Sequence, residues 1–432
     1  MVNNSYYKCS FCGTTLRLRY QVGYFDIPVS IYCPKCNCHV SGKIYINQNE
    51  PSISENIFGA ETIDEHNAEY LIELSTEFLV DKCKKNDPDQ IDLSIFLKSN
   101  PFDEERAKRR NDLMYLAQNA EHSANIIENL YNLLKKNEIS LIKECFLKTD
   151  DPIMDYYRKN VDYNKIKNRV DAMLAIKHYI NSVISPTMTA GVFKNMYEIM
   201  NTKVRRIVQN HLPAFLEYLS YINTDYLDTY LYRMPKFFID YLKCVEQLIP
   251  VYDNYSTFDS IDLSAKGIST ISIDDLSSIY KKGYELLCDS IDLVSGLYNI
   301  ETFGHFDAFG NGRESFEEKM NKFSSKYNKY KELTTNGSDL FDGIRDRLNN
   351  IIRNAEGHNS IIINGLNQEV TFCNKHKGKI NNFTTSFLEF GKMCIDLYSA
   401  VLYVWEYLYQ LVKFKATLID KIKLNYGLQL KL

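Results

Sequence analysis

The stretch FLEFGKMCIDLYSAVLYVWEYLYQLV, residues 387–412, carries the clearest helical pattern in this chain. Its apolar residues recur at alternating steps of three and four, which places them along one side of a helix. These residues are Phe387, Phe390, Cys394, Leu397, Val401, Val404, Leu408 and Leu411. Such a seam forms where one helix packs against another. The stretch therefore predicts a helical bundle or helix pair, and we expect the protein to be mainly α.

The middle of the chain, from about residue 61 onward, also favours helix. Proline and glycine number only 10 and 18 among 432 residues, which suits helices with short connections. Thr62 followed by Glu65 resembles a capping box and predicts a helix over residues 62–85. A long helix is predicted over residues 103–136, with apolar residues at Leu113, Leu116, Ala120, Ile127 and Leu130.

The second of these helices contains the basic run RAKRR, with Arg106, Lys108, Arg109 and Arg110. Such a run could contact a phosphate backbone. A solvated helix face is the more common role of such residues, and it is the interpretation that we adopt for this run.

The first forty residues hold five of the eleven cysteines, in YKCSFCGTTLRLRYQVGYFDIPVSIYCPKCNCHV. Cys9 and Cys12 form one C-x-x-C pair, and Cys33 and Cys36 form another at the spacing of a zinc ribbon. We expect these four thiolates to bind a structural zinc ion, because a full thiolate set leaves no position for substrate. Cys38 or His39 could replace Cys36. The alternative is that the cysteines are ordinary buried or free thiols.

The surface of this predicted ribbon is a candidate for nucleic-acid binding. Among residues 1–46 the cations Lys8, Arg17, Arg19, Lys35 and Lys43 face the single acid Asp26. Tyrosines that could stack on bases are interleaved with them, at Tyr6, Tyr7, Tyr20, Tyr24 and Tyr32. A protein-binding or purely structural role is an equal alternative for the ribbon.

Composition excludes some classes of function. The formal net charge is -4, so the whole molecule is not a basic clamp for nucleic acid, and any such contact must be local. The amino terminus lacks the basic segment and apolar core of a secretory signal. No stretch reaches the ~18 uncharged apolar residues of a membrane span, since Glu406 interrupts the nearest one. We therefore expect a cytoplasmic protein without membrane contact.

The stretch NNIIRNAEGHNSIIING, residues 349–365, holds the strongest candidate for chemistry. We expect a helix that begins after Ser338 and ends near Gly357, because glycine disfavours helix. Beyond it, the sequence predicts a β-hairpin with Asn364 and Gly365 at its turn. Arg353, Asn354 and His358 then lie at the end of a helix, where arginine and histidine could also serve only to solvate the last carbonyl groups.

RNAEGH resembles the R-x4-6-H motif of the HEPN superfamily, whose members often carry Asn directly after the Arg. The resemblance covers about residues 265–432 and implies a helical bundle that dimerises and cleaves RNA without a catalytic metal. It implies catalytic roles for Arg353 and His358, which Asn354 would position. It also implies a setting in bacterial anti-phage defence or toxin-like growth arrest, with an antitoxin or a phage-derived trigger as a further partner.

Taken together, the sequence predicts a mainly α protein in which a helical bundle is preceded by a small β zinc ribbon. We expect the ribbon at residues 1–50, a helical middle region at 51–264 and a HEPN-like domain at 265–432. The alternative is a non-catalytic dimer that uses the ribbon to bind nucleic acid or protein. Glu356 would repel phosphate unless it points away or pairs with a cation. Arg206 and His211 repeat the R-x4-H spacing, and we interpret that pair as structural.

Overall fold

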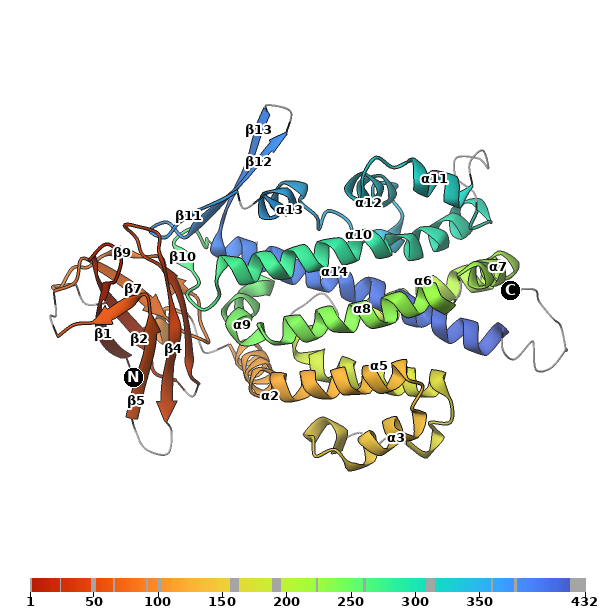
Figure 1. Cartoon of the computed structure of the whole chain (residues 1–432), viewed down its shortest axis with the longest axis horizontal. Coiled ribbons are helices and arrows are strands. Elements are labelled where there is room, and N and C mark those ends of the chain that lie inside the picture. Colours follow the sequence, from red (N-terminus) through yellow and green to blue (C-terminus); the bar gives the residue numbers. More distant parts are fainter. Residues whose placement is uncertain are drawn as a thin grey trace. The chain divides into compact units, whose positions relative to one another are not determined.

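The computed structural model describes residues 2–23, 25–47, 52–64, 67–90, 92–99, 103–155, 163–188, 196–222, 224–258, 262–307, 315–358, 360–376 and 379–419 (Figure 1). The chain forms two compact units, and neither is continuous in sequence. Unit 1 comprises residues 1–118, 243–281 and 349–395, and unit 2 comprises residues 119–242, 282–348 and 396–432. Residue 50, where the predicted ribbon ends, and the last residues of the predicted third domain lie outside the described ranges.

Unit 1 contains the β-structure of the first ninety residues. One sheet has the strand order β6-β1-β2-β7-β9 and another the order β3-β4-β5. The bounds are β1 Val2–Cys9, β2 Thr15–Gln21, β3 Ile27–Tyr32, β4 His39–Asn47, β5 Ser52–Phe58, β6 Ala60–Thr62, β7 Tyr70–Leu74, β8 Val80–Asp81 and β9 Lys84–Lys85. Alternate residues of β2 and Tyr7 of β1 enter one apolar core with β3 and β4, which Leu16, Leu18, Val29 and Val40 help to fill.

The predicted helix over residues 62–85 is wrong, because strands occupy this segment. Thr62 ends β6 and pairs with Tyr7, so it caps no helix. β7 lies parallel to β2, with Ile72 opposite Leu18, and four of its five residues are buried. A short apolar run that is buried in this way has no helical or strand period of its own. This segment forms a strand because it pairs with β2, which is distant in sequence.

The rest of unit 1 is helical except for a second β-element. Its helices are α1 Ile95–Lys98, α9 Val245–Asn254, the 3-10 turn η2 Tyr255–Thr257 and α13 Asn350–Gly357. Its further strands are β10 Lys266–Gly267, which pairs with β8, and the three-stranded sheet β11 Ile361–Asn364, β12 Glu369–His376 and β13 Lys379–Ser386. The predicted hairpin is thus confirmed as β11 and β12, and β13 extends it. Its turn occupies residues 365–368, so Gly365 lies in the turn as predicted, whereas Asn364 is the last residue of β11 and pairs with Glu369.

Three long helices contribute residues to both units. They are α2 Glu104–Lys135, α10 Ile273–Phe303 and α14 Phe387–Phe414. All eight apolar seam residues predicted for residues 387–412 are buried on α14, and so are the five predicted for α2. The mainly α class and these two helices are confirmed. Within the described ranges, no helix combines the length and apolar character needed to cross a membrane.

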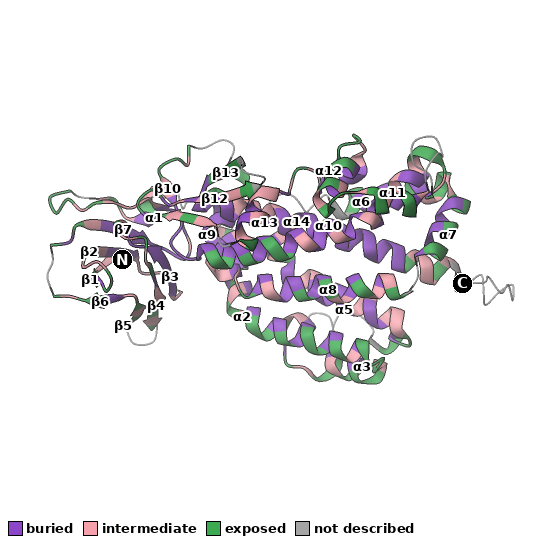
Figure 2. Cartoon of the chain, turned by 45° about the horizontal axis from the view of Figure 1, so that its top comes forward, coloured by how far each residue is buried: buried purple, intermediate pink, exposed green. Residues whose placement is uncertain are grey.

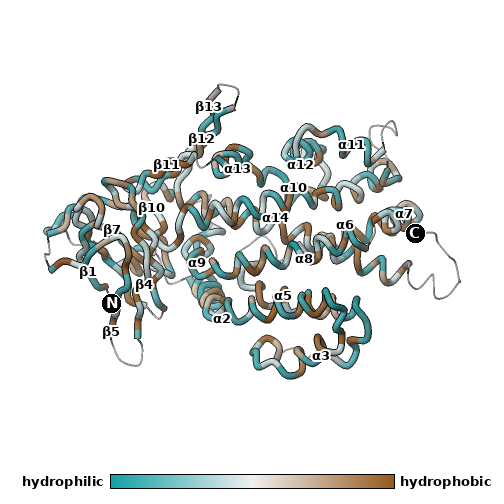
Figure 3. Tube along the Cα trace, in the orientation of Figure 1, coloured by the Kyte–Doolittle hydropathy of each residue, from teal (hydrophilic) through white to brown (hydrophobic). Residues whose placement is uncertain are grey.

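Unit 2 is a helical assembly with an aromatic core. Its remaining elements are α3 Ile139–Lys148, η1 Tyr163–Lys165, α5 Arg169–Met188, α6 Met196–Asn210, α7 Leu212–Tyr221, α8 Thr224–Leu242, α11 Phe316–Lys322, α12 Lys326–Thr334, η3 Asp339–Phe341 and the π-turn η4 Lys415–Ile419. Buried and exposed residues alternate along α8, whereas most described residues of α5 are buried or intermediate (Figures 2 and 3). Tyr241 stacks on Tyr398 with ring centroids 3.8 Å apart.

The single helix predicted from Ser338 to Gly357 is wrong in its first half. Ser338 caps only the short turn η3, and the chain then turns at Asp346, whose φ of 58° lies outside helical space. The hydroxyl of Tyr330 donates to the Ile344 carbonyl, and the side chain of Arg345 donates to two further carbonyls. The amides of Ile344 and Arg345 both donate to the Phe341 carbonyl and form a single turn, and the helix restarts beyond Asp346 as α13.

Candidate metal centre and candidate ribonuclease site

The four predicted zinc ligands lie together in unit 1. The sulfur atoms of Cys9, Cys12, Cys33 and Cys36 all lie within 4.8 Å of one another. Cys9 Sγ lies 3.7 Å from Cys36 Sγ, and Cys12 Sγ lies 3.6 Å from Cys33 Sγ. A tetrahedral zinc ion with Zn–S bonds of about 2.3 Å requires sulfur separations of about 3.8 Å. The four residues therefore fit a metal ion, and the separations are far longer than a disulfide bond of about 2.0 Å.

The first cysteine pair lies in a tight backbone turn. The amide of Cys9 donates to the Thr14 carbonyl, and the amide of Gly13 donates back to the Cys9 carbonyl, both at 2.9 Å. Gly13 has a φ of 76°, which glycine adopts without steric cost. The turn brings both thiols to the same side of the chain, as a metal-binding knuckle requires.

The second pair repeats this turn. The amide of Cys33 donates to the Cys38 carbonyl, and the amide of Asn37 donates to the Cys33 carbonyl, again at 2.9 Å. Asn37, with a φ of 58°, occupies the position of the glycine in the first turn, and asparagine tolerates this conformation better than most residues. Its side chain accepts a hydrogen bond from the amide of Gly365 at 2.8 Å. The second turn is thereby bonded to the β11–β12 hairpin within unit 1.

The two spare ligand candidates do not join the cluster. Cys38 contributes its carbonyl to the second turn and is not among the four clustered thiols. His39 Nε2 lies 2.9 Å from Ser30 Oγ, and its ring stacks on Tyr32 at a centroid distance of 4.9 Å. The side chain of His39 thus has a structural role in packing between β3 and β4.

The pKa values of the thiols differ within the cluster when no metal is bound, and burial raises the pKa of Cys9. A hydrogen bond with the Thr14 hydroxyl lowers the pKa of Cys12 to about 6, although burial opposes the shift. Burial raises the pKa of Cys33 to about 12. A metal ion must displace the proton of such a buried thiol, so metal binding and proton release are coupled at this site.

The structure reduces the number of ribbon tyrosines that are available to stack on nucleic-acid bases. Tyr7 and Tyr20 are buried and donate hydrogen bonds to the Glu55 carboxylate, so they cannot stack on bases. Tyr32 is buried as well, and Tyr24 lies outside the described residues. Tyr6 remains half-buried on β1 directly opposite Arg17 of β2.

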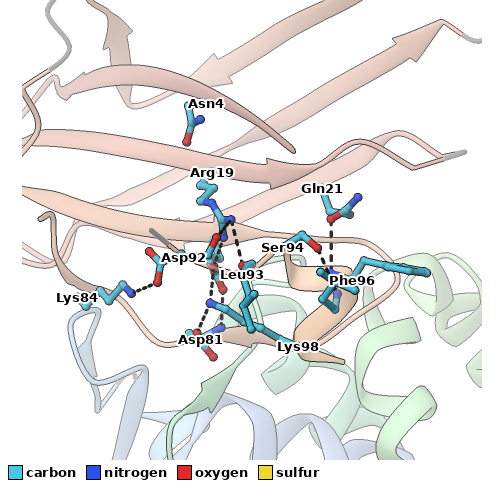
Figure 4. A network of polar contacts seen from close by, with 12 residues as sticks. Asn4, Arg19, Gln21, Asp81, Lys84, Asp92, Leu93, Ser94, Phe96 and Lys98 are labelled. Carbon is cyan, nitrogen blue, oxygen red and sulfur yellow. Dashed lines mark hydrogen bonds and ion pairs between the residues drawn. The ribbon is translucent and has the colours of Figure 1, made fainter. Parts of the chain in front are cut away.

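Two of the five ribbon cations are neutralised by carboxylates. Arg19 is buried and its Nη1 lies 2.6 Å from Glu73 Oε1, in a polar network that also binds Lys98 (Figure 4). Lys43 pairs with Asp26 and with Glu246 of α9, at 3.6 and 3.4 Å.

The other three ribbon cations are not paired with a carboxylate within the described residues. Among the described residues, Lys8, Arg17 and Lys35 form no ion pair. The guanidinium of Arg17 donates only to the neutral side chains of Asn4 and Asn86, at 2.9 and 3.2 Å. Lys8 and Arg17 lie on neighbouring strands, with Glu61 of β6 opposite Lys8, whereas Lys35 lies in the turn between β3 and β4.

The predicted catalytic residues lie at the end of α13. Asn349 begins this helix, since its side chain accepts from the Ile351 amide at 2.9 Å. Gly357 is the last helical residue, as predicted, and His358 caps the helix through its backbone amide. Ile352 and Ala355 are buried, and α13 packs against β12.

The three side chains of the motif differ in their solvent exposure. Arg353 and Asn354 are half-buried, and Arg353 Nη1 lies 3.5 Å from Asn354 Oδ1. His358 is exposed, and within the described ranges its imidazole takes part in no hydrogen bond. The structure thus places the three residues at one helix end with an imidazole open to solvent.

The acidic residue inside the motif is neutralised. Glu356 Oε2 lies 2.9 Å from the ammonium nitrogen of Lys281 on α10, and Oε1 lies 3.1 Å from it. Both residues belong to unit 1. Lys281 stands 75 positions before Glu356, and no spacing rule connects it to the motif, so the sequence does not predict this ion pair.

The second R-x4-H pair has the structural role expected of it. Arg206 pairs with Glu301 and Asp339, and His211 marks the break between α6 and α7.

No known protein family, no curated protein and no solved structure matches this chain.

Proposed function

We propose that this protein is a metal-independent endoribonuclease of the HEPN type, with Arg353, Asn354 and His358 as its catalytic group. The observation that carries the proposal is the end of α13. There an exposed imidazole follows a partly exposed arginine by five positions, and the intervening Glu356 is neutralised by Lys281. A phosphate group can approach this surface without facing an uncompensated carboxylate.

The chemistry divides between two side chains. The ribose 2′-oxygen attacks the adjacent phosphorus and loses its proton, while the bond from phosphorus to the 5′-oxygen breaks and that oxygen gains a proton. His358 acts as general base or acid, because imidazole exchanges protons near neutral pH. Arg353 stabilises the negative charge of the phosphorane, and Asn354 positions its guanidinium. The products are a 2′,3′-cyclic phosphate and a 5′-hydroxyl.

A homodimer is part of the proposal. Residues five apart on a regular helix are rotated by about 140°, so Arg353 and His358 of one α13 diverge unless the helix end reorients the histidine. His358 lies just beyond Gly357, where the helix has ended, and a two-fold axis would add a second group from the other copy. Such a nuclease would suit anti-phage defence or growth arrest, released by a phage-derived trigger or restrained by an antitoxin.

The test is RNA cleavage by the purified full chain. Wild type should cleave transfer RNA or a long single-stranded RNA in the presence of EDTA and leave cyclic phosphate ends. Arg353→Ala and His358→Ala should lose at least a hundredfold in rate, since a general acid–base group contributes about 10²–10⁴. His211→Ala is the matched control, because it alters the other R-x4-H pair, and it should cleave like wild type. Equal cleavage by all variants would refute the assignment.

A non-catalytic nucleic-acid-binding dimer is the second candidate, and the charge on the ribbon favours it. Lys8 and Arg17 lie on neighbouring strands of one sheet without carboxylate partners. RNA binding that weakens in Lys8→Ala and Arg17→Gln, with no cleavage and no effect of His358→Ala, would support this candidate. The binding should also fall with added salt, because released counterions drive it.

A further inference from the structure

Unit 2 contains a cavity that the proposed ribonuclease does not use. It has a volume of about 300 Å³ and lies among α7, α8, α10 and α11. Its lining residues are Tyr218, Tyr221, Ile222, Tyr226, Asp292, Phe316, Glu317 and Met320. Four of these eight residues are aromatic and two are acidic, and none is basic. This composition indicates the chemistry of an occupant.

The aromatic walls are held by contacts beneath them. The Tyr218 hydroxyl donates to the Leu293 carbonyl of α10 at 2.9 Å. Its ring lies so close to Gly296 that a Cβ there would fall 2.2 Å from Tyr218 Cζ. Tyr221 contacts Phe316 edge to face, with ring centroids 6.1 Å apart. Because these rings are already held in place, binding a ligand against their faces and edges costs little further side-chain entropy.

The carboxylates give the cavity a negative character. Asp292 Oδ1 lies 2.8 Å from the ammonium nitrogen of Lys329, and its side chain is 21% exposed. Among the described residues, Lys329 is the one cation that forms an ion pair with Asp292. Glu317, at the start of α11, is exposed at the rim. One lysine therefore faces two carboxylates around this cavity.

The tyrosine at the rim experiences this negative field. Burial raises the pKa of Tyr221, and the charges of Glu317, Asp307 and Asp292 raise it further. Burial also raises the pKa of Asp292, while Lys329 opposes that shift. The pKa shifts agree with a poorly hydrated and negatively charged site, which would gain from a cation.

We propose that this cavity binds a small organic ammonium ion. Aromatic faces attract a cation through their quadrupoles, and the methyl or methylene groups of an alkylated ammonium pack against the same rings. An anion would be repelled by Asp292 and Glu317. A small metal ion needs several oxygen ligands, and the aromatic rings of the walls do not supply them. The inference is independent of the proposed nuclease, because it concerns none of its residues.

Calorimetric titration of the full chain tests the charge requirement. The probes are choline, spermidine and 3,3-dimethylbutan-1-ol, which has the shape of choline without its charge. Choline or spermidine should bind at least tenfold more tightly than the alcohol, and the tighter of the two identifies a quaternary ammonium or a polyamine source. Equal binding of the alcohol would show a merely apolar cavity and overturn the proposal. So would dissociation constants above about 10 mM for both cations.

Variants of one exposed tyrosine locate the site. Tyr221 is 51% exposed, so its replacement should leave the fold intact. Tyr221→Leu should weaken binding about five- to tenfold, the loss of one cation–π contact, whereas Tyr221→Phe should retain it. Tyr115→Leu changes an exposed tyrosine of α2 outside the cavity and serves as a control. Unchanged affinity in Tyr221→Leu would place the ion elsewhere and refute the assignment.

Discussion

The buried half of the basic run RAKRR should be essential for stability and the exposed half dispensable. Arg106 and Arg110 turn inward from α2, and their side chains are 10% and 9% exposed. Both bind the carboxylate of Asp253 on α9, which is completely buried, at 2.6 and 3.1 Å. The expectation of a solvated helix face is therefore wrong for these two arginines.

Asp253→Asn keeps the size of this side chain and removes its charge. Two buried guanidinium groups then lose their counter-charge, and removal of one partner of a buried pair costs about 3–5 kcal/mol. Because two cations depend on one carboxylate, we expect a loss of about 4 kcal/mol. For a domain of 150–250 residues this corresponds to a melting temperature lower by roughly 8–16 °C.

Urea unfolding of wild type, Asp253→Asn and Lys108→Ala measures the difference. Lys108 belongs to the same run but is exposed, so its loss should change the free energy of unfolding by less than about 0.5 kcal/mol. A loss below about 1 kcal/mol in Asp253→Asn, at an unchanged urea dependence, would refute the reasoning. The arginines would then be satisfied by the Asp253 carbonyl and Asn254, which Arg106 already contacts.

Three further outcomes follow from the structure. Cys33→Ser should lose bound zinc on metal analysis while Cys38→Ser keeps it, and full zinc content in Cys33→Ser would contradict the assigned ligands. Burial alone would raise the pKa of Asp81, but hydrogen bonds from two lysines outweigh it and lower that pKa. The stabilisation from Asp81 is thus complete above the unfolded-state pKa of about 3.9 and is lost as pH falls through the folded-state value. Wild type should lose unfolding free energy below about pH 4 more steeply than Asp81→Asn, and parallel profiles would count against this pairing. Gly296→Ala should cost about 1–3 kcal/mol, because its Cβ would overlap the Tyr218 ring, and an unchanged melting temperature would show that the ring can move.

Periodic and spaced features of the chain could be predicted from sequence. The seam of α14 was identified because each of its residues repeats a helical step, and burial of Phe390 or Leu408 follows from that repeat. The clustering of the four N-terminal cysteines follows from the sequence because two C-x-x-C turns have a specific spacing. Gly357 and the hairpin after it were found for a similar reason, since glycine stops helices and the Asn-Gly pair favours turns.

Features that depend on distant partners could not be predicted. The strand β7 looks locally like part of a helix and is fixed only by its parallel pairing with β2. The helix before α13 is broken at Asp346, where the Tyr330 hydroxyl donates to the Ile344 carbonyl and accepts from the Arg347 amide. The ion pair that neutralises Glu356 comes from Lys281 on another helix. In each case the deciding contact joins residues that no local pattern relates.

The three-part construction of unit 1 affects the timing of its folding during synthesis. A ribosome adds about 5–20 residues per second, so tens of seconds separate residues 1–118 from residues 349–395. Until then, the side chain of Asn37 in the second cysteine turn lacks the hydrogen bond that it later accepts from the Gly365 amide. The segment from Arg353 to His358 arrives in the same late stretch. A partly synthesised copy would therefore lack the residues of the proposed catalytic group.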